Sequence, residues 1–213
     1  MRVDVFTLVP HAFAWLTEQQ PIAGVLGREL ELRLFNYRDT TPLRAGQVDD
    51  EPYGGGAGMV LRVDVVAAAL DAAYGGQPAN RVIALTPQGR QLTQEVVEEL
   101  ATEDAVTLLS SRFEGFDERI VQHLASDAIS IGPYVLSNGE LPAMVLLDAL
   151  ARRLPGALAE GSGELESFSA ELGGALEYPH FTRPPEFRGW SVPEVLLSGD
   201  HAKIERWRRE HVR

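Results

Sequence analysis

Three apolar runs in the middle of the chain each lead into a loop that contains glycine or proline. Nearly continuous apolar runs of this length are typical of parallel strands that are covered on both faces. The carboxyl ends of parallel strands lie at one edge of a sheet, which is where α/β proteins most often bind ligands. The runs and their loops are 82–85 with "TPQGR" (86–90), 105–109 with "SSRFEGFDER" (110–119), and 128–131 with "GPYVLSNGELP" (132–142).

Helical patterns alternate with these strands and with two earlier apolar runs, 3–8 and 30–35. This alternation predicts an α/β fold with a parallel sheet. Thr93 is placed to cap the second helix, and Asp117 the third. The fourth is apolar on almost every side, so we expect it to be buried between the sheet and a partner subunit. The predicted helices cover 63–73, 94–101, 118–126, 141–151 and approximately 200–211.

The length of 213 residues allows one large domain or one domain with an appendage. Small residues dominate "GALAEGSGE" at 156–164, which is typical of a flexible linker. We therefore expect a first domain over 1–155, a linker over 156–165 and a partial C-terminal domain over 166–213.

Composition excludes several classes of protein. The chain has no cysteine, so disulfides, thiolate metal sites and cysteine nucleophiles are ruled out. The first residues, "MRVDVFTLVP", are typical of a strand rather than a signal peptide. The longest apolar runs are too short or too polar to span a bilayer. These patterns indicate a cytoplasmic protein without a membrane partner.

The net charge of −12 bears on nucleic-acid binding. Phosphate contacts favour basic proteins, so an RNA partner would require a local basic patch. The tail "HAKIERWRREHVR" at 201–213 is one candidate, and a solvated helix face is the alternative.

The three loops predict a pocket lined largely by main chain. Backbone N–H and C=O groups in such a pocket can bind the edge of an adenine. The side chains of Leu85, Ile131 and Leu136 can cover its faces.

A glycine-rich segment, "VDDEPYGGGAGMVLR" at 48–62, allows two interpretations, a flexible turn or a mobile cover over a large substrate. It lacks the Lys-Ser/Thr of a phosphate loop, which argues against a nucleotide-binding module of another fold that uses 53–58. The five histidines show no metal-binding spacing, so we predict no metal site. His180 is either a substrate contact or a packed loop residue.

These motifs together resemble a known family. The segments "VDDEPYGGGAGM", "LTPQGR", "SRFEGFDERI", "SIGPYVLSNGELPA", "PHFTRP" and "VPEVLLSGDHAKIERWR" occur here in family order. They are similar to segments of the bacterial tRNA (guanine-N1)-methyltransferases, the TrmD family of the SPOUT superfamily.

The resemblance implies a parallel-sheet SPOUT fold of the α/β class with a deep trefoil knot, and a homodimer with two active sites between its subunits. It implies S-adenosylmethionine as cofactor and tRNA, not DNA, as partner, with methylation at N1 of the guanosine 3′ of the anticodon. A requirement for Mg²⁺ stays open. Family members continue beyond the equivalent of "RW" with more helix, so the C-terminal helical portion is expected to be shortened here.

The resemblance also implies roles for individual residues. The substrate-binding residues it implies are Tyr53, Gly54, Gly55, Gly56, Gly58, His180 and Arg183. The cofactor-binding residues it implies are Leu85, Thr86, Pro87, Ser111, Phe113, Glu114, Gly115, Ser130, Ile131, Gly132, Pro133, Tyr134, Val135, Leu136, Asn138, Gly139 and Pro142.

Two residues match the family's catalytic positions. Arg152, after the apolar helix, would stabilise negative charge on the guanine oxygen. Glu166 stands in "ESF" where the family has "DSF", and would accept the N1 proton. The alternative role for Arg152 is that of a cation that stabilises the C-terminus of a helix. The alternative for Glu166 is that of a solvated carboxylate in the linker.

Several positions depart from the family pattern. Ser111 replaces a glycine, Phe113 a tyrosine, Pro133 an aspartate and Asn138 a glycine. With Glu166, these departures leave a second hypothesis, a degenerate SPOUT-family protein that binds S-adenosylmethionine or RNA with weak or no catalysis.

Overall fold

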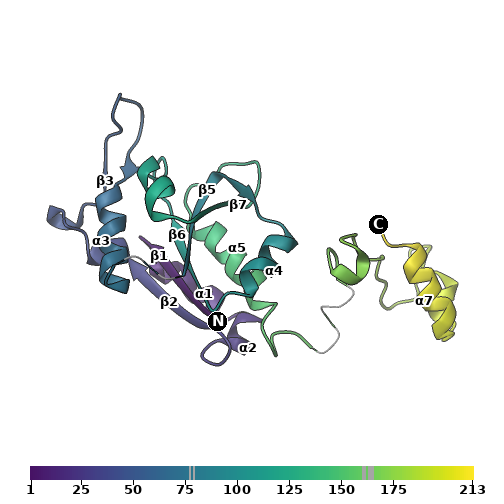
Figure 1. Ribbon diagram of the computed structural model, residues 1–213. Helices are drawn as coiled ribbons and strands as arrows, with labels where there is room; N and C mark the ends of the chain where they lie inside the picture. The colour runs from purple at the N-terminus through teal and green to yellow at the C-terminus, as the bar shows by residue number, and fades with distance from the viewer. Residues whose placement is uncertain (77, 79, 160–161, 163–165) are drawn as a thin grey trace. The chain divides into compact units, whose positions relative to one another are not determined.

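The computed structural model describes residues 1–76, 78, 80–159, 162 and 166–213. The chain forms two compact units, Met1–Ala157 and Leu158–Arg213 (Figure 1). Part of the predicted linker, residues 160–161 and 163–165, lies outside the described residues.

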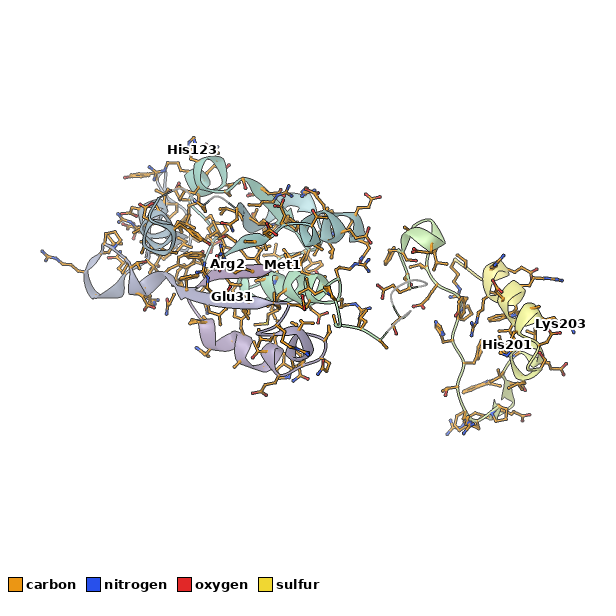
Figure 2. The ribbon with its side chains drawn as sticks, turned by 60° about the horizontal axis from the view of Figure 1, so that its bottom comes forward. Met1, Arg2, Glu31, His123, His201 and Lys203 are labelled. Atoms are coloured by element: carbon orange, nitrogen blue, oxygen red, sulfur yellow. The ribbon has the colours of Figure 1, made fainter. Side chains whose placement is uncertain are left out.

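A five-stranded sheet forms the centre of the first unit, in the order β2-β1-β6-β5-β7. All four neighbouring pairs are parallel, which confirms the sheet predicted from the apolar runs. The strands are β1 (Arg2–Thr7), β2 (Glu31–Asn36), β5 (Arg81–Gln91), β6 (Ala105–Ser110) and β7 (Asp127–Ser130). Figure 2 shows Met1 and Arg2 beside Glu31, where β1 and β2 begin.

Alternating side chains of β1 reach the two cores of this unit. Val3 and Val5 pack in one core and Phe6 packs in the other. Both faces of the sheet are therefore buried, as the continuous apolar runs predicted.

Helices cover each face of the sheet (Figure 1). On one face, α3 (Val63–Tyr74) and the π-helical turn η4 (Ile120–Leu124) pack with Phe6. The other face is covered by α4 (Gln94–Ala101) and α5 (Glu140–Ala151). The Thr93 hydroxyl accepts a hydrogen bond from the Val96 N–H at 3.4 Å, which confirms the predicted cap of α4.

Short elements connect these layers. The sequence patterns did not predict the turns and helices between β1 and β2, because each is only about one turn long. They are η1 (Pro10–Phe13), α1 (Ala14–Thr17) and α2 (Ile22–Val25). After β2 follow η2 (Tyr37–Asp39), η3 (Arg44–Gly46) and the antiparallel pair β3 (Asp49–Asp50) and β4 (Val60–Leu61).

β5 continues well beyond the predicted 82–85 and pairs with β7 twice. Leu85 and Arg90 are both register partners of Ile129. A residue in a strand can pair with one neighbouring strand on each of its two sides. Ile129 therefore has Leu85 on one side and Arg90 on the other, and β7 lies between the first and last parts of β5. A Cβ atom on Gly89 would lie 2.4 Å from the Ile129 nitrogen, so this crossing requires glycine.

The second unit is small and rich in aromatic contacts. Its helix α7 (His201–Glu210) confirms the helix predicted near 200–211. Trp207 stacks on His211 with ring centroids 4.1 Å apart. Figure 2 labels His201 and Lys203 on this helix. The remaining elements are η5 (Ala170–Leu172), β8 (Glu186–Phe187), β9 (Trp190–Ser191) and α6 (Glu194–Leu197).

The basic tail is partly neutralised within α7. Lys203 lies 3.1 Å from Asp200, and Arg209 pairs with Glu205. Arg208 lies over the ring of Tyr178, 5.0 Å from its centroid. Among the described residues, no helix is long and apolar enough to cross a membrane.

Asp4 is a buried carboxylate in the middle of β1. It accepts hydrogen bonds from Arg33 at 2.6 and 2.7 Å and from the Tyr74 hydroxyl at 2.6 Å. Burial raises the pKa of Asp4, but the hydrogen bonds from Arg33 and Tyr74 and the nearby positive charges outweigh it, so the pKa lies below its ordinary value.

We predict that Asp4→Asn removes part of the acid sensitivity of the fold. Because the folded-state pKa of Asp4 lies below its unfolded value, near 3.8, its contribution is complete above that value and is lost as the pH falls through the folded-state pKa. The variant should lose roughly 2 kcal/mol of unfolding free energy at neutral pH. Urea unfolding between neutral pH and the acid limit tests this, and an equal pH dependence in both proteins would contradict it.

Candidate active site

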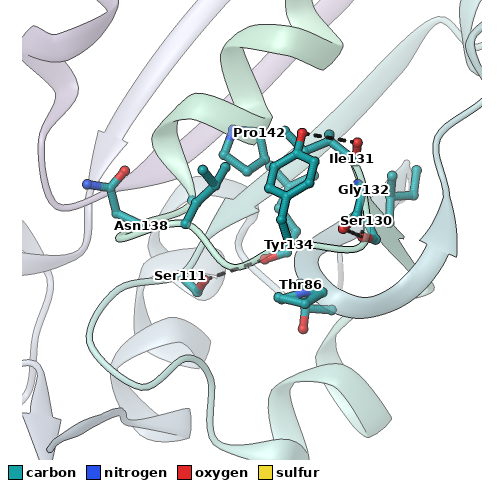
Figure 3. A pocket seen from close by; sticks show the side chains of 13 residues that line it. Thr86, Ser111, Ser130, Ile131, Gly132, Tyr134, Asn138 and Pro142 are labelled. Carbon is teal, nitrogen blue, oxygen red and sulfur yellow. Dashed lines mark hydrogen bonds between the residues drawn. The ribbon is translucent and has the colours of Figure 1, made fainter.

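A small pocket lies at the carboxyl ends of β6 and β7 and beside the middle of β5, at residues 85–87 (Figure 3). Its volume is about 50 Å³. All three predicted segments contribute to it, as expected from their places in the sheet. The prediction of a loop at 86–90 was wrong, because this segment continues β5 by pairing with β7. The lining residues are Leu85, Thr86, Pro87, Ser111, Ile129, Ser130, Ile131, Gly132, Tyr134, Leu136, Asn138, Gly139 and Pro142.

Hydrogen bonds join the loops around this pocket. The Gly139 N–H donates to the Ser111 carbonyl at 2.8 Å, and the Ser111 hydroxyl donates to the Leu85 carbonyl at 3.5 Å. The Ser130 hydroxyl donates to the Gly132 carbonyl at 3.1 Å (Figure 3). The shape of the pocket therefore depends on contacts between loops that are distant in sequence.

Two glycines allow the close approach of these loops. A Cβ atom on Gly139 would lie 2.5 Å from the Ser111 nitrogen. A Cβ atom on Gly132 would lie 2.2 Å from the ring of Tyr134. Gly139 meets backbone atoms, so this position requires glycine. At Gly132 a side chain would require the Tyr134 ring to move.

The ring of Tyr134 lies across the pocket (Figure 3). Its hydroxyl donates to the Ile131 carbonyl at 3.3 Å, and its N–H donates to the Gly132 carbonyl at 2.9 Å. The side chain is half exposed. Tyr134 thus occupies an acceptor of the main chain that another hydrogen-bond donor could use.

Most of the predicted cofactor-binding residues line this pocket, but five do not. Phe113, Glu114, Gly115, Pro133 and Val135 belong to the same loops without lining it. Of these, all but Gly115 are exposed.

Ile129 lines the pocket but was not predicted to do so. It lies in the same buried strand as Ser130, so the apolar run 128–131 could have indicated it.

The glycine-rich segment lies between the antiparallel strands β3 and β4. Gly54, Gly55, Gly56 and Gly58 all have positive φ, which explains the use of glycine here. A phosphate loop follows a strand and opens a helix, so this position argues against that alternative. The side chain of Tyr53 is fully exposed.

Gly58 connects this segment to the loop after β6. A Cβ atom on Gly58 would lie 2.3 Å from a carboxyl oxygen of Glu114. The Glu114 N–H donates to the Met59 carbonyl at 2.9 Å, and the Leu61 N–H donates to the Gly115 carbonyl at 3.0 Å. The two segments therefore pack as one layer.

Comparison with known proteins identifies the family. The sequence model of "tRNA (Guanine-1)-methyltransferase TrmD" matches residues 1–213. The chain belongs to the TrmD family.

Curated relatives support this membership. A tRNA (guanine-N(1)-)-methyltransferase of Dehalococcoides mccartyi (strain CBDB1) is 46% identical over 212 residues, which cover 99% of this chain and 85% of that protein. One from Brevibacillus brevis is 47% identical over 210 residues, covering 98% and 85%. One from Geobacter metallireducens is 47% identical over 211 residues, covering 98% and 85%.

The two candidate catalytic residues of this TrmD family member lie in different units. Arg152 follows the last turn of α5, and its N–H donates to the Asp148 carbonyl at 3.2 Å. Glu166 lies at the start of the described part of the second unit, where its carbonyl accepts from the Ser169 N–H at 3.0 Å. Their proposed roles remain predictions.

The predicted substrate residues of the second unit are exposed. Arg183 lies in an irregular segment. The His180 ring hydrogen-bonds with a Glu177 carboxyl oxygen at 2.8 Å and lies 4.8 Å from the ring of Tyr178. His180 is therefore supported by local contacts, and its role toward substrate remains a prediction. His123 is exposed on η4 (Figure 2).

A second, larger pocket of about 950 Å³ lies beside β3 and β4. Asp50, Glu51, Asp64, Asp117 and Glu118 give it an acidic wall. Its two arginines are engaged with these carboxylates. Arg62 bonds Asp50 and Asp64, and Arg119 bonds Asp117. Within the described residues, no group of His, Cys, Asp and Glu side chains is arranged to hold a metal ion.

We predict that Gly58→Ala separates the glycine-rich segment from the loop after β6. The new Cβ would displace Glu114, so the amides of Glu114 and Leu61 should exchange with solvent faster, by about tenfold or more. Native-state hydrogen exchange measures this directly.

Gly54→Ala is the matched control for this experiment. Gly54 has a similar φ of +87°, against +83° for Gly58, but nothing lies within 4 Å of an added Cβ. Both variants carry the same backbone strain. Equal exchange rates in the two variants would show that contact with Glu114 has no importance.

Proposed function

We propose that this chain is an S-adenosylmethionine-dependent methyltransferase that modifies N1 of the guanosine 3′ of the anticodon in tRNA. The observation that carries the proposal is that the three strand-end loops, in a member of the TrmD family, together form a pocket. Curated relatives that carry the name tRNA (guanine-N(1)-)-methyltransferase match almost the whole chain, which supports the reaction and the substrate.

The chemical types of the groups that line the pocket suit an adenosyl group. Leu85, Ile131 and Leu136 offer apolar surface, and the main chain of 130–139 offers donors and acceptors. Ligand pockets commonly measure roughly 300–1,000 Å³, whereas this one measures about 50 Å³. The pocket would therefore widen on binding. Tyr134, half exposed and held by one long hydrogen bond, is the side chain best placed to move.

Each step of the proposed reaction requires a particular side chain of the protein. S-adenosylmethionine supplies an electrophilic methyl group when bound. Guanine N1 is a poor nucleophile until it loses its proton, and Glu166 would accept that proton. Negative charge then develops on the guanine oxygen, and the guanidinium of Arg152 would stabilise it. The substitution of Glu for Asp at 166 moves the carboxylate by about 1 Å, which can change the rate substantially.

The second pocket bears on how RNA would bind. Its carboxylates disfavour phosphate groups, so the glycine-rich segment would contact a base or a sugar rather than the backbone. Phosphate contacts would then come from exposed cations elsewhere, with Arg183 as the candidate named by the family motif.

A trefoil knot and a homodimer belong to the same proposal. The placement of β7 between two parts of β5 supports a threaded backbone. Leu141 and Val145 of α5 are 54% and 46% exposed, which supports a partner subunit on that face of the helix. Light scattering would test the dimer, and a monomer that still methylates would contradict an active site shared between subunits. The proposed location is the cytoplasm.

A second candidate function is binding of S-adenosylmethionine without efficient transfer. The narrow pocket and Glu166 in place of the family's aspartate favour it. Mg²⁺ dependence is a further open feature of the proposed reaction. Chromatographic identification of the methylated nucleoside, with G or A at the target position of the tRNA and with or without a chelator, distinguishes these cases.

We predict that Arg152→Ala and Glu166→Ala each lose most of the turnover, by about a hundredfold or more, because each removes a group that acts in the transition state. Calorimetry should show that both variants keep their affinity for S-adenosylmethionine. Single-turnover methylation of tRNA measures the loss.

Neighbouring residues provide matched controls. Arg153→Ala removes a guanidinium that pairs with Glu98 at 3.7 Å, and Glu171→Ala removes an exposed carboxyl from the same unit as Glu166. Both controls should keep turnover near that of the wild type. Wild-type rates in Arg152→Ala or Glu166→Ala would disprove the assigned role.

A further inference from the structure

Glu140, the first residue of α5, has an incompletely bonded carboxyl group inside the protein. It is 4% exposed. Its Oε1 accepts a hydrogen bond from the Thr7 hydroxyl at 2.6 Å. Its Oε2 is buried and has no hydrogen-bond partner among the described residues. A guanidinium nitrogen of Arg112 lies 4.0 Å from that oxygen, beyond hydrogen-bond distance.

Other unsatisfied groups lie nearby. The Ser110 hydroxyl is buried and also has no hydrogen-bond partner in the described part of the chain, and the buried Tyr37 hydroxyl only approaches the Ser110 backbone without the geometry of a full hydrogen bond. Burial, and then the charge of Glu140, raise the pKa of Tyr37 well above its ordinary value. Each unsatisfied buried group costs about 1–3 kcal/mol, and native proteins contain few of them. Glu140 and Ser110 directly follow and precede the pocket residues Gly139 and Ser111, so two of these unsatisfied groups adjoin the pocket.

Arg112 begins a strained loop. Phe113 has a φ of +58°, which is unfavourable for a residue other than glycine. Such a conformation costs about 1–3 kcal/mol and persists only where the surroundings impose it. The turn is closed by the Gly115 N–H, which donates to the Arg112 carbonyl at 2.9 Å.

Main-chain contacts hold this loop at both ends. On one side, the Gly139 N–H donates to the Ser111 carbonyl at 2.8 Å, directly before Glu140. On the other, the Glu114 N–H donates to the Met59 carbonyl at 2.9 Å. Between these two hydrogen bonds, the loop carries the guanidinium of Arg112, which the buried carboxylate of Glu140 attracts.

We propose that Glu140 is a positioning residue, which draws the guanidinium of Arg112 inward and so fixes the loop that carries Phe113 and Glu114 at the edge of the donor pocket. The inference rests on the proposed function. When the donor binds, Arg112 closes the remaining gap to Oε2. Binding and this contact then stabilise each other, because a ligand favours the state in which it has more contacts.

The test compares Glu140→Gln, Arg112→Met and the double variant by calorimetry with S-adenosylhomocysteine, which binds without reacting. Each single variant should raise the Kd by about tenfold or more, as expected for a lost charge-assisted hydrogen bond. The double variant should be no weaker than the singles, because the two groups act through one contact. Arg112 is partly exposed, so Arg112→Met tests the contact even if the buried substitution impairs folding.

Asp4→Asn is the control for loss of a buried carboxylate. Asp4 is fully buried in β1, where it bonds Arg33 and Tyr74 and has no hydrogen bond with Glu140 or Arg112 among the described residues. This variant should melt at a lower temperature and keep its Kd within about twofold of the wild type.

Exchange of the Gly115 amide in the ligand-free protein gives a second, independent result. Glu140→Gln and Arg112→Met should both accelerate it, while Asp4→Asn should not. Wild-type affinity and wild-type exchange in both variants, or fully additive losses in the double variant, would overturn the proposal. A wild-type protein that binds no S-adenosylhomocysteine would instead contradict the proposed function, and the exchange rates would still decide the role of Glu140.

Discussion

The site depends on one backbone arrangement, the placement of β7 between the first and last parts of β5. Ile129 pairs with both Leu85 and Arg90, and Gly89 crosses so near the backbone of β7 that a Cβ has no room. These pairings are made by main-chain groups. The only requirement on the side chains is that none of them prevents the two backbones from approaching at the crossing. Arg90 then reinforces it through Asp127 at 2.7 Å and Glu99 at 2.9 Å.

This arrangement brings together loops that are far apart in sequence. The loops after β5, β6 and β7 share hydrogen bonds through Leu85, Ser111 and Gly139. The segments 111–115 and 132–139 have no regular structure, and 86–91 forms strand only through its pairing with β7, so each segment is held by the others. The strain at Phe113 and the unsatisfied carboxyl oxygen of Glu140 lie where these loops meet, which is where stored strain most often serves function.

The sequence predicted the parts of the fold that depend on apolar pattern. The five parallel strands, α4 with its Thr93 cap and the position of α5 followed from periodicity and capping chemistry. α5 is buried on the side that faces the sheet, whereas Leu141 and Val145 are exposed. The continuation of β5 through "TPQGRQ" did not, because that segment has no apolar alternation and its pairing is set by β7. The burial of Glu140 was also missed, because glutamate side chains are rarely fully buried.

Hydrogen exchange of the whole chain, with and without S-adenosylhomocysteine, tests whether the three segments form one binding site. We expect slower exchange together in 85–91, 111–115 and 130–139, because each segment is held by the other two. Slower exchange in one of these segments alone, or only outside them, would show that the strand ends do not form one binding site.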